Sequence, residues 1–149
     1  MLKKLLGFLK LLDPRRVRAL QDGWITDLKI KAPSAGVRAW SLSGGNQQRV
    51  VLAKWLATRP RVFILDGPTI GIDIASKSTI HQIVRDLAEK GIAIVIISDE
   101  IPEILHNCSR VLVMREGRIV REVPDATAVG EADLLALVSG KNGNGAVSA

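Results

Sequence analysis

The chain has 149 residues, which is enough for one domain. Its 47% hydrophobic and 24% charged residues predict a soluble protein with a packed core, and this core must be aliphatic because aromatic residues make up only 3%. Its single cysteine, Cys108, excludes a disulfide framework and a cysteine-rich zinc site. The formal charge of +6 fits a solvated charged face, and it would also suit nucleic acid, an anionic membrane surface or a phosphate-bearing ligand. No apolar run is long enough to span a bilayer. The segment Met1–Leu12 is basic and leucine-rich, but Lys10 interrupts it and no small-residue cleavage site follows, so we expect no signal peptide.

The first part of the chain predicts helices separated by a loop. Leucines at 2, 5, 9 and 12 recur at helical spacing, and Asp13-Pro14 predicts a fresh helix with Pro14 at its first position. Residues 31–37 contain proline, serine and glycine and predict a loop. A glycine turn then opens a helix that runs to about Thr58. That helix is apolar nearly all round, so we expect it to be largely buried.

Two short apolar runs in the middle of the chain predict strands of a parallel sheet. Residues 62–65 and 92–97 are unbroken aliphatic or aromatic runs, which are typical of strands covered on both faces. A helix is expected between them over residues 76–90, and Gly91 stands where a left-handed helix end is favoured. The alternation of helix and strand predicts an α/β fold.

The last part predicts a small hairpin between two helices. The turn of the hairpin is Glu116-Gly117, and residues 140–149 form a Gly-, Asn- and Ser-rich tail that we expect to be flexible. The expected elements are a short helix near residues 102–106, strands at 111–114 and 119–122, and a helix over 131–138.

Two features of the sequence carry chemistry. The glycine turn at a helix start would present backbone amides, the helix dipole and the Ser43 hydroxyl to an anion. The carboxylate of Asp66, directly after an apolar strand, stands where phosphate-transfer ATPases hold Mg²⁺, usually through water. Taken singly, the first also fits an ordinary turn and the second an aspartate that caps the next turn.

Together these motifs resemble the ATP-binding subunits of ABC transporters. The run Leu42-Ser-Gly-Gly-Asn-Gln-Gln48 is followed by a helix and then by Ile64-Leu-Asp-Gly-Pro-Thr-Ile-Gly-Ile-Asp73. The Asn-Gln-Gln ending and the later segment Ile97–Leu105 are similar to the second ATPase half of monosaccharide importers. The resemblance covers about Leu20 to Glu122 and implies a partial ABC nucleotide-binding domain with parallel strands, helices and a small C-terminal β-hairpin.

The resemblance assigns a role to each motif. In the family, the signature loop presses on the γ-phosphate of an ATP bound by the opposite ATPase half. Asp66 matches the Walker B aspartate, which holds Mg²⁺ through water, and Asp73 matches the loop at the interface between the two halves. The implied nucleotide-binding residues are Ser43, Gly44, Gly45, Asn46, Gln47 and Gln48.

The same resemblance implies how the chain is organised and with what it works. Residues 1–39 would be a remnant of the helical subdomain, 40–123 a partial ATPase core, and 124–149 a C-terminal helix and flexible tail. The implied partners are a second ATPase half or chain, transmembrane permease subunits and, indirectly, a sugar-binding protein. The implied location is peripheral, on the cytoplasmic face of the cell membrane. ATP and Mg²⁺ would bind only in a complete or composite site.

Three departures from the family limit the expected activity. The phosphate-loop pattern, Gly-x₄-Gly-Lys-Ser/Thr, does not occur in the sequence. We therefore expect the chain to correspond to the later part of one ATPase domain. Gly67 replaces the catalytic glutamate, and loss of a general base costs on the order of 10²- to 10⁴-fold in rate. Asp99 stands at the switch position, where the family commonly has histidine. No catalytic residue is therefore intact, and we do not expect ATPase activity from the isolated chain.

Two hypotheses about the function follow, and the sequence disfavours a third. The chain is a truncated ATP-binding component of a sugar importer, or it is a non-catalytic partner that completes a composite ATP site on a full ATPase chain. A nucleic-acid-linked ATPase is disfavoured, because such proteins flank the signature with long heptad helices and none is present. We expect His81, His106 and Cys108 to be structural.

Overall fold

The computed structural model describes residues 13–140; the expected leucine-rich helix before Asp13 and the expected tail beyond Gly140 lie outside the described residues. Two compact units divide the described chain. The first comprises residues 13–63 and 68–95, and the second comprises residues 64–67 and 96–140. Each unit is described by itself.

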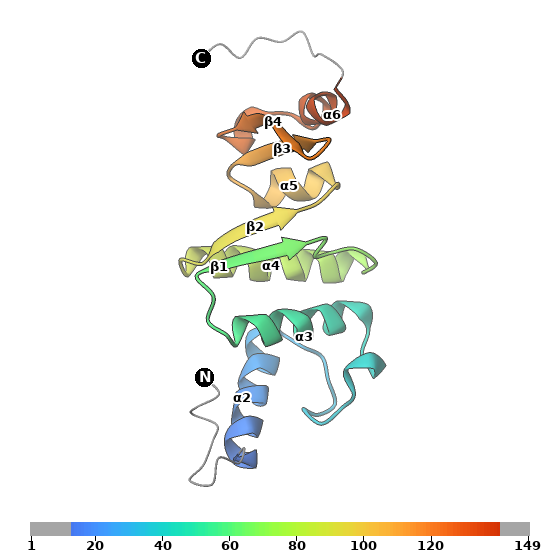
Figure 1. Ribbon diagram of the computed structural model, residues 1–149. Coiled ribbons are helices and arrows are strands. Elements are labelled where there is room, and N and C mark those ends of the chain that lie inside the picture. Colours follow the sequence, from blue (N-terminus) through green and yellow to red (C-terminus); the bar gives the residue numbers. More distant parts are fainter. Residues whose placement is uncertain (1–12, 141–149) are drawn as a thin grey trace. The chain divides into compact units, whose positions relative to one another are not determined.

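The elements follow the expected order of helices and strands (Figure 1). The helices are α2 (Pro14–Asp27), α3 (Gly44–Leu56), α4 (Ile74–Glu89), α5 (Ile101–Asn107) and α6 (Glu131–Ser139), with short 3₁₀ turns η1 (Ala39–Ser41) and η2 (Ala126–Ala128). The strands are β1 (Val62–Asp66), β2 (Ala93–Ile97), β3 (Val111–Arg115) and β4 (Arg118–Val123). The predicted α/β class is confirmed.

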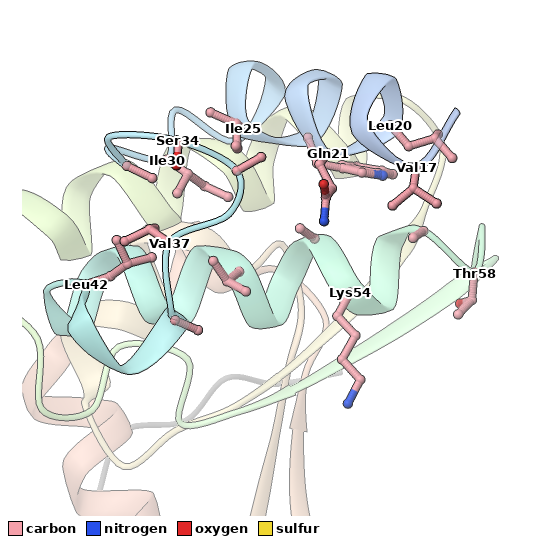
Figure 2. Close-up of a pocket in the computed structure, with 17 residues that line it drawn as sticks. Val17, Leu20, Gln21, Ile25, Ile30, Ser34, Val37, Leu42, Lys54 and Thr58 are labelled. Atoms are coloured by element: carbon pink, nitrogen blue, oxygen red, sulfur yellow. The ribbon is translucent and has the colours of Figure 1, made fainter. Parts of the chain in front are cut away.

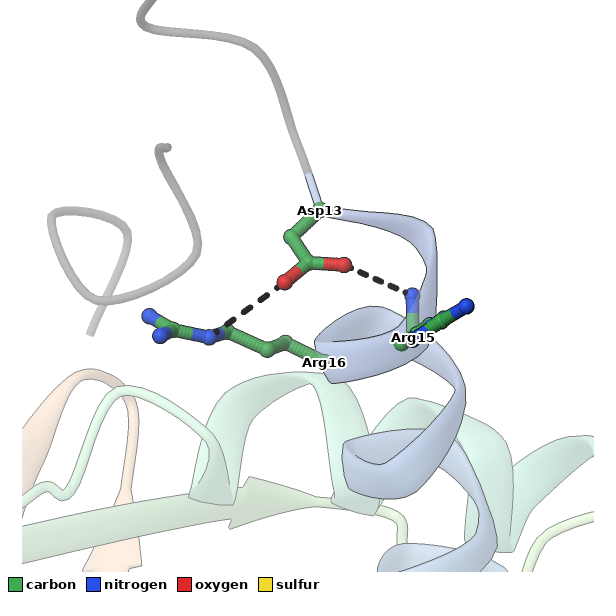
Figure 3. Close-up of polar contacts among 3 residues, drawn as sticks. All are labelled: Asp13, Arg15 and Arg16. Atoms are coloured by element: carbon green, nitrogen blue, oxygen red, sulfur yellow. Dashed lines mark hydrogen bonds and ion pairs between the residues drawn. The ribbon is translucent and has the colours of Figure 1, made fainter. Parts of the chain in front are cut away.

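Helix α2 begins where Asp13-Pro14 predicts. The Asp13 carboxylate accepts a hydrogen bond from the Arg15 backbone N–H at 3.0 Å, and its other oxygen lies 3.4 Å from the Arg16 guanidinium Nε (Figure 3). Pro14 occupies the first helical position, where its missing N–H costs nothing. The capped start fixes the direction in which α2 enters the first unit.

Helix α3 is buried along one stripe, and the expectation that it is largely buried is wrong. The buried residues are Gly45, Arg49, Leu52 and Leu56, which recur at helical spacing. Val51 and Trp55, on other faces of the helix, are about half exposed. In the first unit α3 contacts α4, whose Ile80, Ile83 and Val84 are buried (Figure 1).

Strands β1 and β2 pair in parallel. The Ala93 N–H donates to the Arg61 carbonyl at one end of the pair, and the Gly67 N–H donates to the Ile97 carbonyl at the other, both at 3.0 Å or less. The expectation that the first strand is covered on both faces is wrong, because Val62 and Ile64 are 57% and 62% exposed while their neighbours are buried. Alternate residues of β1 therefore face solvent in the described part of the chain.

The second unit contains the predicted hairpin. Strands β3 and β4 pair antiparallel across the Glu116-Gly117 turn, and both turn residues have positive φ, as a two-residue turn of this kind requires. The core of the unit is formed by Ile104, Val113 and Leu134. Across residues 13–140, no helix is long and apolar enough to cross a membrane.

Candidate functional site

The start of α3 presents backbone N–H donors. Ser43 is the N-cap residue, and the N–H groups of Asn46 and Gln47 both donate to its carbonyl at 2.9 Å. The N–H groups of the first helical residues have no carbonyl one turn earlier to bond, and the helix dipole adds positive potential there. This helix end therefore offers donors to a phosphate group.

The two signature glycines meet different surroundings. A Cβ added to Gly45 would collide with the side chain of Ser76 in the first turn of α4. A Cβ added to Gly44 would lie 3.5 Å from Cγ2 of Ile72, an ordinary contact. The structure thus places the loop before α4 directly against the start of α3, and it brings the signature together with the segment that contains Asp73.

Asp73 caps α4 and is exposed. Its Oδ1 accepts from the Ser76 backbone N–H at 2.9 Å. The hydrogen bonds from the Ser76 side chain and backbone hold the pKa of the Asp73 carboxyl below its ordinary value. The carboxylate of Asp73 is therefore fixed beside the signature glycines in its charged form at neutral pH.

The stabilising effect of this charge depends on pH. Because the pKa of Asp73 is lower in the folded state than in the unfolded chain, its contribution is present above about pH 4 and is lost as the pH falls through the folded value. We expect Asp73→Asn to lower the free energy of unfolding at pH 7, and the difference from wild type to shrink below pH 4. Urea unfolding at a series of pH values measures this; a difference constant with pH would contradict it. Asp125 titrates in the same direction in both proteins, so its effect cancels.

Side-chain hydrogen bonds organise the residues that follow the signature glycines. The Asn46 Nδ2 donates to Ser43 Oγ at 2.9 Å, and the Asn46 Oδ1 accepts from the Lys31 backbone N–H at 2.8 Å. The Gln47 amide donates to the Leu42 carbonyl at 2.7 Å. These amides are thus engaged within the protein itself.

Sequence reasoning missed Arg49. Its side chain is buried, with 6% exposure, and Nη1 donates to the Lys29 carbonyl at 2.7 Å and lies 3.4 Å from Asn46 Oδ1. Among the described residues its Nε has no hydrogen-bond partner. Helical spacing places Arg49 on the stripe of Gly45, Leu52 and Leu56, but nothing local in the sequence indicates that a charged side chain is buried there.

The second unit holds the other predicted residues. Asp66 ends β1 with its side chain exposed, and Gly67 follows with a left-handed φ of 53°. The Gly67 N–H bonds to Ile97, so the segment that carries Asp99 follows the neighbouring strand at the same edge. Within residues 13–140 no three His, Cys, Asp or Glu side chains gather to hold a metal ion. One carboxylate is nevertheless compatible with Mg²⁺, which commonly takes one or two carboxylates, waters and substrate phosphates.

The cysteine does not show the features of a nucleophile. Burial and the nearby Glu103 charge raise the pKa of the Cys108 thiol, which disfavours the reactive thiolate. His106 is exposed at the end of α5, and His81 is half-buried in α4.

A groove of about 720 Å³ separates α2 from α3 in the first unit. Figure 2 shows Val17, Leu20 and Gln21 of α2 above α3, with Ile30, Val37 and Leu42 along the loop that joins the helices. Most of its lining is apolar; Lys54 and Thr58 stand at the α3 side.

Comparisons with known proteins point to one family. Residues 16–70 match the family model described as ABC transporter. The chain is 45% identical over 132 residues to the "Ribose import ATP-binding protein RbsA" of Yersinia pestis, covering 87% of this chain and 25% of that protein. It is 50% identical over 120 residues to the protein of the same name from Jannaschia, covering 80% and 23%.

A solved structure agrees with the sequence relatives. The structure described as the dimeric form of MJ0796, a bacterial ABC transporter cassette, matches with a TM-score of 0.66 and 25% identity over 78% of this chain and 50% of that one. The chain spans about a quarter of the length of the curated relatives. The predicted resemblance is confirmed: the chain is a homologue of the ATP-binding subunits of ABC-type sugar importers.

Proposed function

We propose that this chain supplies the signature side of a composite ATP site in a sugar importer. The phosphates of that ATP would be held by a phosphate loop that lies outside these 149 residues, on an opposing ATPase half or chain. The observation that carries the proposal is the start of α3 beside the Asp73 loop, where Ser43 and Gly44 are exposed and the first helical N–H groups have no carbonyl one turn earlier. The dimeric cassette to which the chain is similar supports an opposing half.

Exposed apolar side chains near the signature support an interface there. Trp40, in η1 just before the signature, is 72% exposed. Ile70, in the loop whose Ile72 faces Gly44, and Ile74, the first residue of α4, are exposed as well. Large apolar side chains at the surface, tryptophan above all, are typical anchors of protein interfaces. An opposing ATPase surface would cover them when it brings its nucleotide to Ser43.

The strand-end residues would serve a different nucleotide, one bound by this chain's own ATPase half. Asp66 would hold Mg²⁺ there, with the nucleotide phosphates as further ligands. Gly67 offers no side chain to orient water, so hydrolysis at that site would lack its general base. Asp99 adds a negative charge that would not favour a phosphate. We propose that this half is catalytically silent.

The groove between α2 and α3 supports the proposed contact with the permease. Its mostly apolar lining suits a helical segment of another protein, and its α2 side belongs to residues 1–39, for which the resemblance implies a remnant of the helical subdomain. The chain would then be held peripherally at the cytoplasmic face of the membrane.

The test is association that depends on nucleotide. Alone, the chain is expected to show no saturable Mg-ATP binding by calorimetry. Mixed with a complete ABC ATPase subunit, such as the Jannaschia ribose-import relative, it is expected to associate with Mg-ATP but not with ADP. Ser43→Arg should abolish that association, because the long side chain fills the space for the phosphate. Sedimentation velocity measures the complex.

A matched control places the same charge elsewhere. Ala88 is exposed near the far end of α4, about 18 Å along the helix from Ser76. Ala88→Arg should leave the association unchanged. Equal loss with both variants, saturable ATP binding by the chain alone, or no shift of the wild-type chain with Mg-ATP would each contradict the proposal.

A further inference from the structure

The signature serine does not use its hydroxyl in the usual way for its position. Serine at an N-cap commonly accepts a hydrogen bond from a backbone N–H of its own helix. Ser43 makes no such bond, and its Oγ accepts instead from the Asn46 Nδ2 at 2.9 Å. Because this bond occupies an acceptor position of the oxygen, the hydroxyl proton remains available to an incoming ligand.

The orientation of the Asn46 amide is fixed by its other end. Its Oδ1 receives the Lys31 backbone N–H at 2.8 Å and lies 3.4 Å from the Arg49 Nη1. Both neighbours are donors, so the end of the amide that faces them must be the oxygen. The NH₂ group consequently points to Ser43, and a flipped amide would lose both bonds.

Arg49 ties this arrangement to the loop that follows α2. Its buried guanidinium donates to the Lys29 carbonyl at 2.7 Å, and Lys29 has a left-handed φ of 52°. Burial of a guanidinium is costly unless its protons are bonded. Through these hydrogen bonds, Arg49 and Asn46 fix the position of residues 29–31 relative to the start of α3.

We propose that Asn46 and Arg49 are positioning residues that orient the Ser43 hydroxyl toward the phosphate, rather than nucleotide contacts themselves. This rests on the proposed composite site, and it replaces the direct contact that the resemblance implies for Asn46. Asn46 acts on the nucleotide through Ser43, and Arg49 acts through Asn46.

A double-mutant cycle separates positioning from a direct contact. Ser43→Ala and Asn46→Ala are each expected to weaken the Mg-ATP-dependent association with a complete ABC ATPase subunit about tenfold or more, as loss of a hydrogen bond to a charged group does. The double variant should be no weaker than Ser43→Ala alone, because Asn46 has then lost the group through which it acts. Losses that multiply in the double variant would overturn the proposal.

A second measurement needs no partner and so separates this inference from the proposed function. NMR scalar couplings of the Ser43 β-protons in the full chain should show one side-chain rotamer in the wild type and averaging in Asn46→Ala. Arg49→Met, which keeps an unbranched apolar side chain and removes the guanidinium donors, should average as well. Gln47→Ala, which removes the neighbouring amide bonded to Leu42, should not.

Each outcome decides one of the two claims. If the wild-type chain fails to associate but Ser43 is ordered by Asn46 and Arg49, the composite site is wrong and the positioning network stands. If Ser43 already averages among rotamers in the wild type, or stays fixed in Asn46→Ala, the positioning role is overturned whatever the association shows.

Discussion

Ile80→Ala is expected to lower the free energy of unfolding of the first unit by about 2–5 kcal/mol, the cost of removing a large aliphatic side chain from a closed core. Ile80 lies in the middle of α4 with 0% exposure. The lost transfer free energy and the remaining cavity both contribute, since neighbouring side chains close such a space only in part. Urea unfolding followed by tryptophan fluorescence reports this directly, because all three tryptophans lie in the first unit.

The matched control is on the same helix. Ile74 is 86% exposed at the first position of α4. Ile74→Ala deletes the same side-chain atoms as Ile80→Ala, but at an exposed position, so it should change the free energy of unfolding by about 0.5 kcal/mol or less. Similar losses for the two variants would mean that α4 does not pack in the register described. The comparison also tests the interface, because Ile74→Ala should weaken nucleotide-dependent association while leaving the fold intact.

Periodicity and end signals in the sequence were enough to predict the elements. Asp13-Pro14 marks the start of α2, the positive-φ Gly91 follows the end of α4, and Glu116-Gly117 forms the hairpin turn as expected. Such signals are local, because caps and turns depend on neighbours within a few residues. They can therefore be recognised even in a chain that spans only about a quarter of the length of its relatives.

Burial was predicted less well, because it depends on what else packs nearby. The apolar run of β1 was expected to be covered on both faces, yet Val62 and Ile64 are exposed in the described residues. The buried Arg49 was missed for the same reason, since its partner carbonyl at Lys29 lies 20 positions earlier in the chain. Hydropathy alone places arginine outside, and only the long-range contact explains its burial.

The second large effect is expected at Gly45. Gly45→Ala should destabilise the first unit by about 1–3 kcal/mol, because its new methyl group meets the Ser76 side chain and α4 must shift away from α3. The methyl meets the Cβ of Ser76 as well as its Oγ, so a change of side-chain rotamer does not relieve the contact. Urea unfolding measures the loss.

Ser76→Gly should relieve the collision. It has a cost of its own, since it places glycine in a helix and removes a side-chain hydrogen bond to Asp73. The double variant should nevertheless be more stable than the sum of the two single losses predicts, with a coupling of about 0.5–3 kcal/mol. Additive losses would show that the absence of a side chain at Gly45 is not what allows α4 to pack against α3.

Substitution of the neighbouring glycine, Gly44, tests whether the lack of a side chain there is needed for packing or for binding of the nucleotide. Gly44→Ala introduces a methyl group with only an ordinary contact to Ile72, and alanine is favoured over glycine in a helix, so stability should be unchanged or slightly raised. If phosphate approaches the amides at the start of α3, the same methyl group should still weaken nucleotide-dependent association. A stable Gly44→Ala chain that associates normally would place the phosphate elsewhere. The two signature glycines would then differ in purpose: Gly44 keeps the helix end open to the nucleotide, and Gly45 keeps the Asp73 loop beside it.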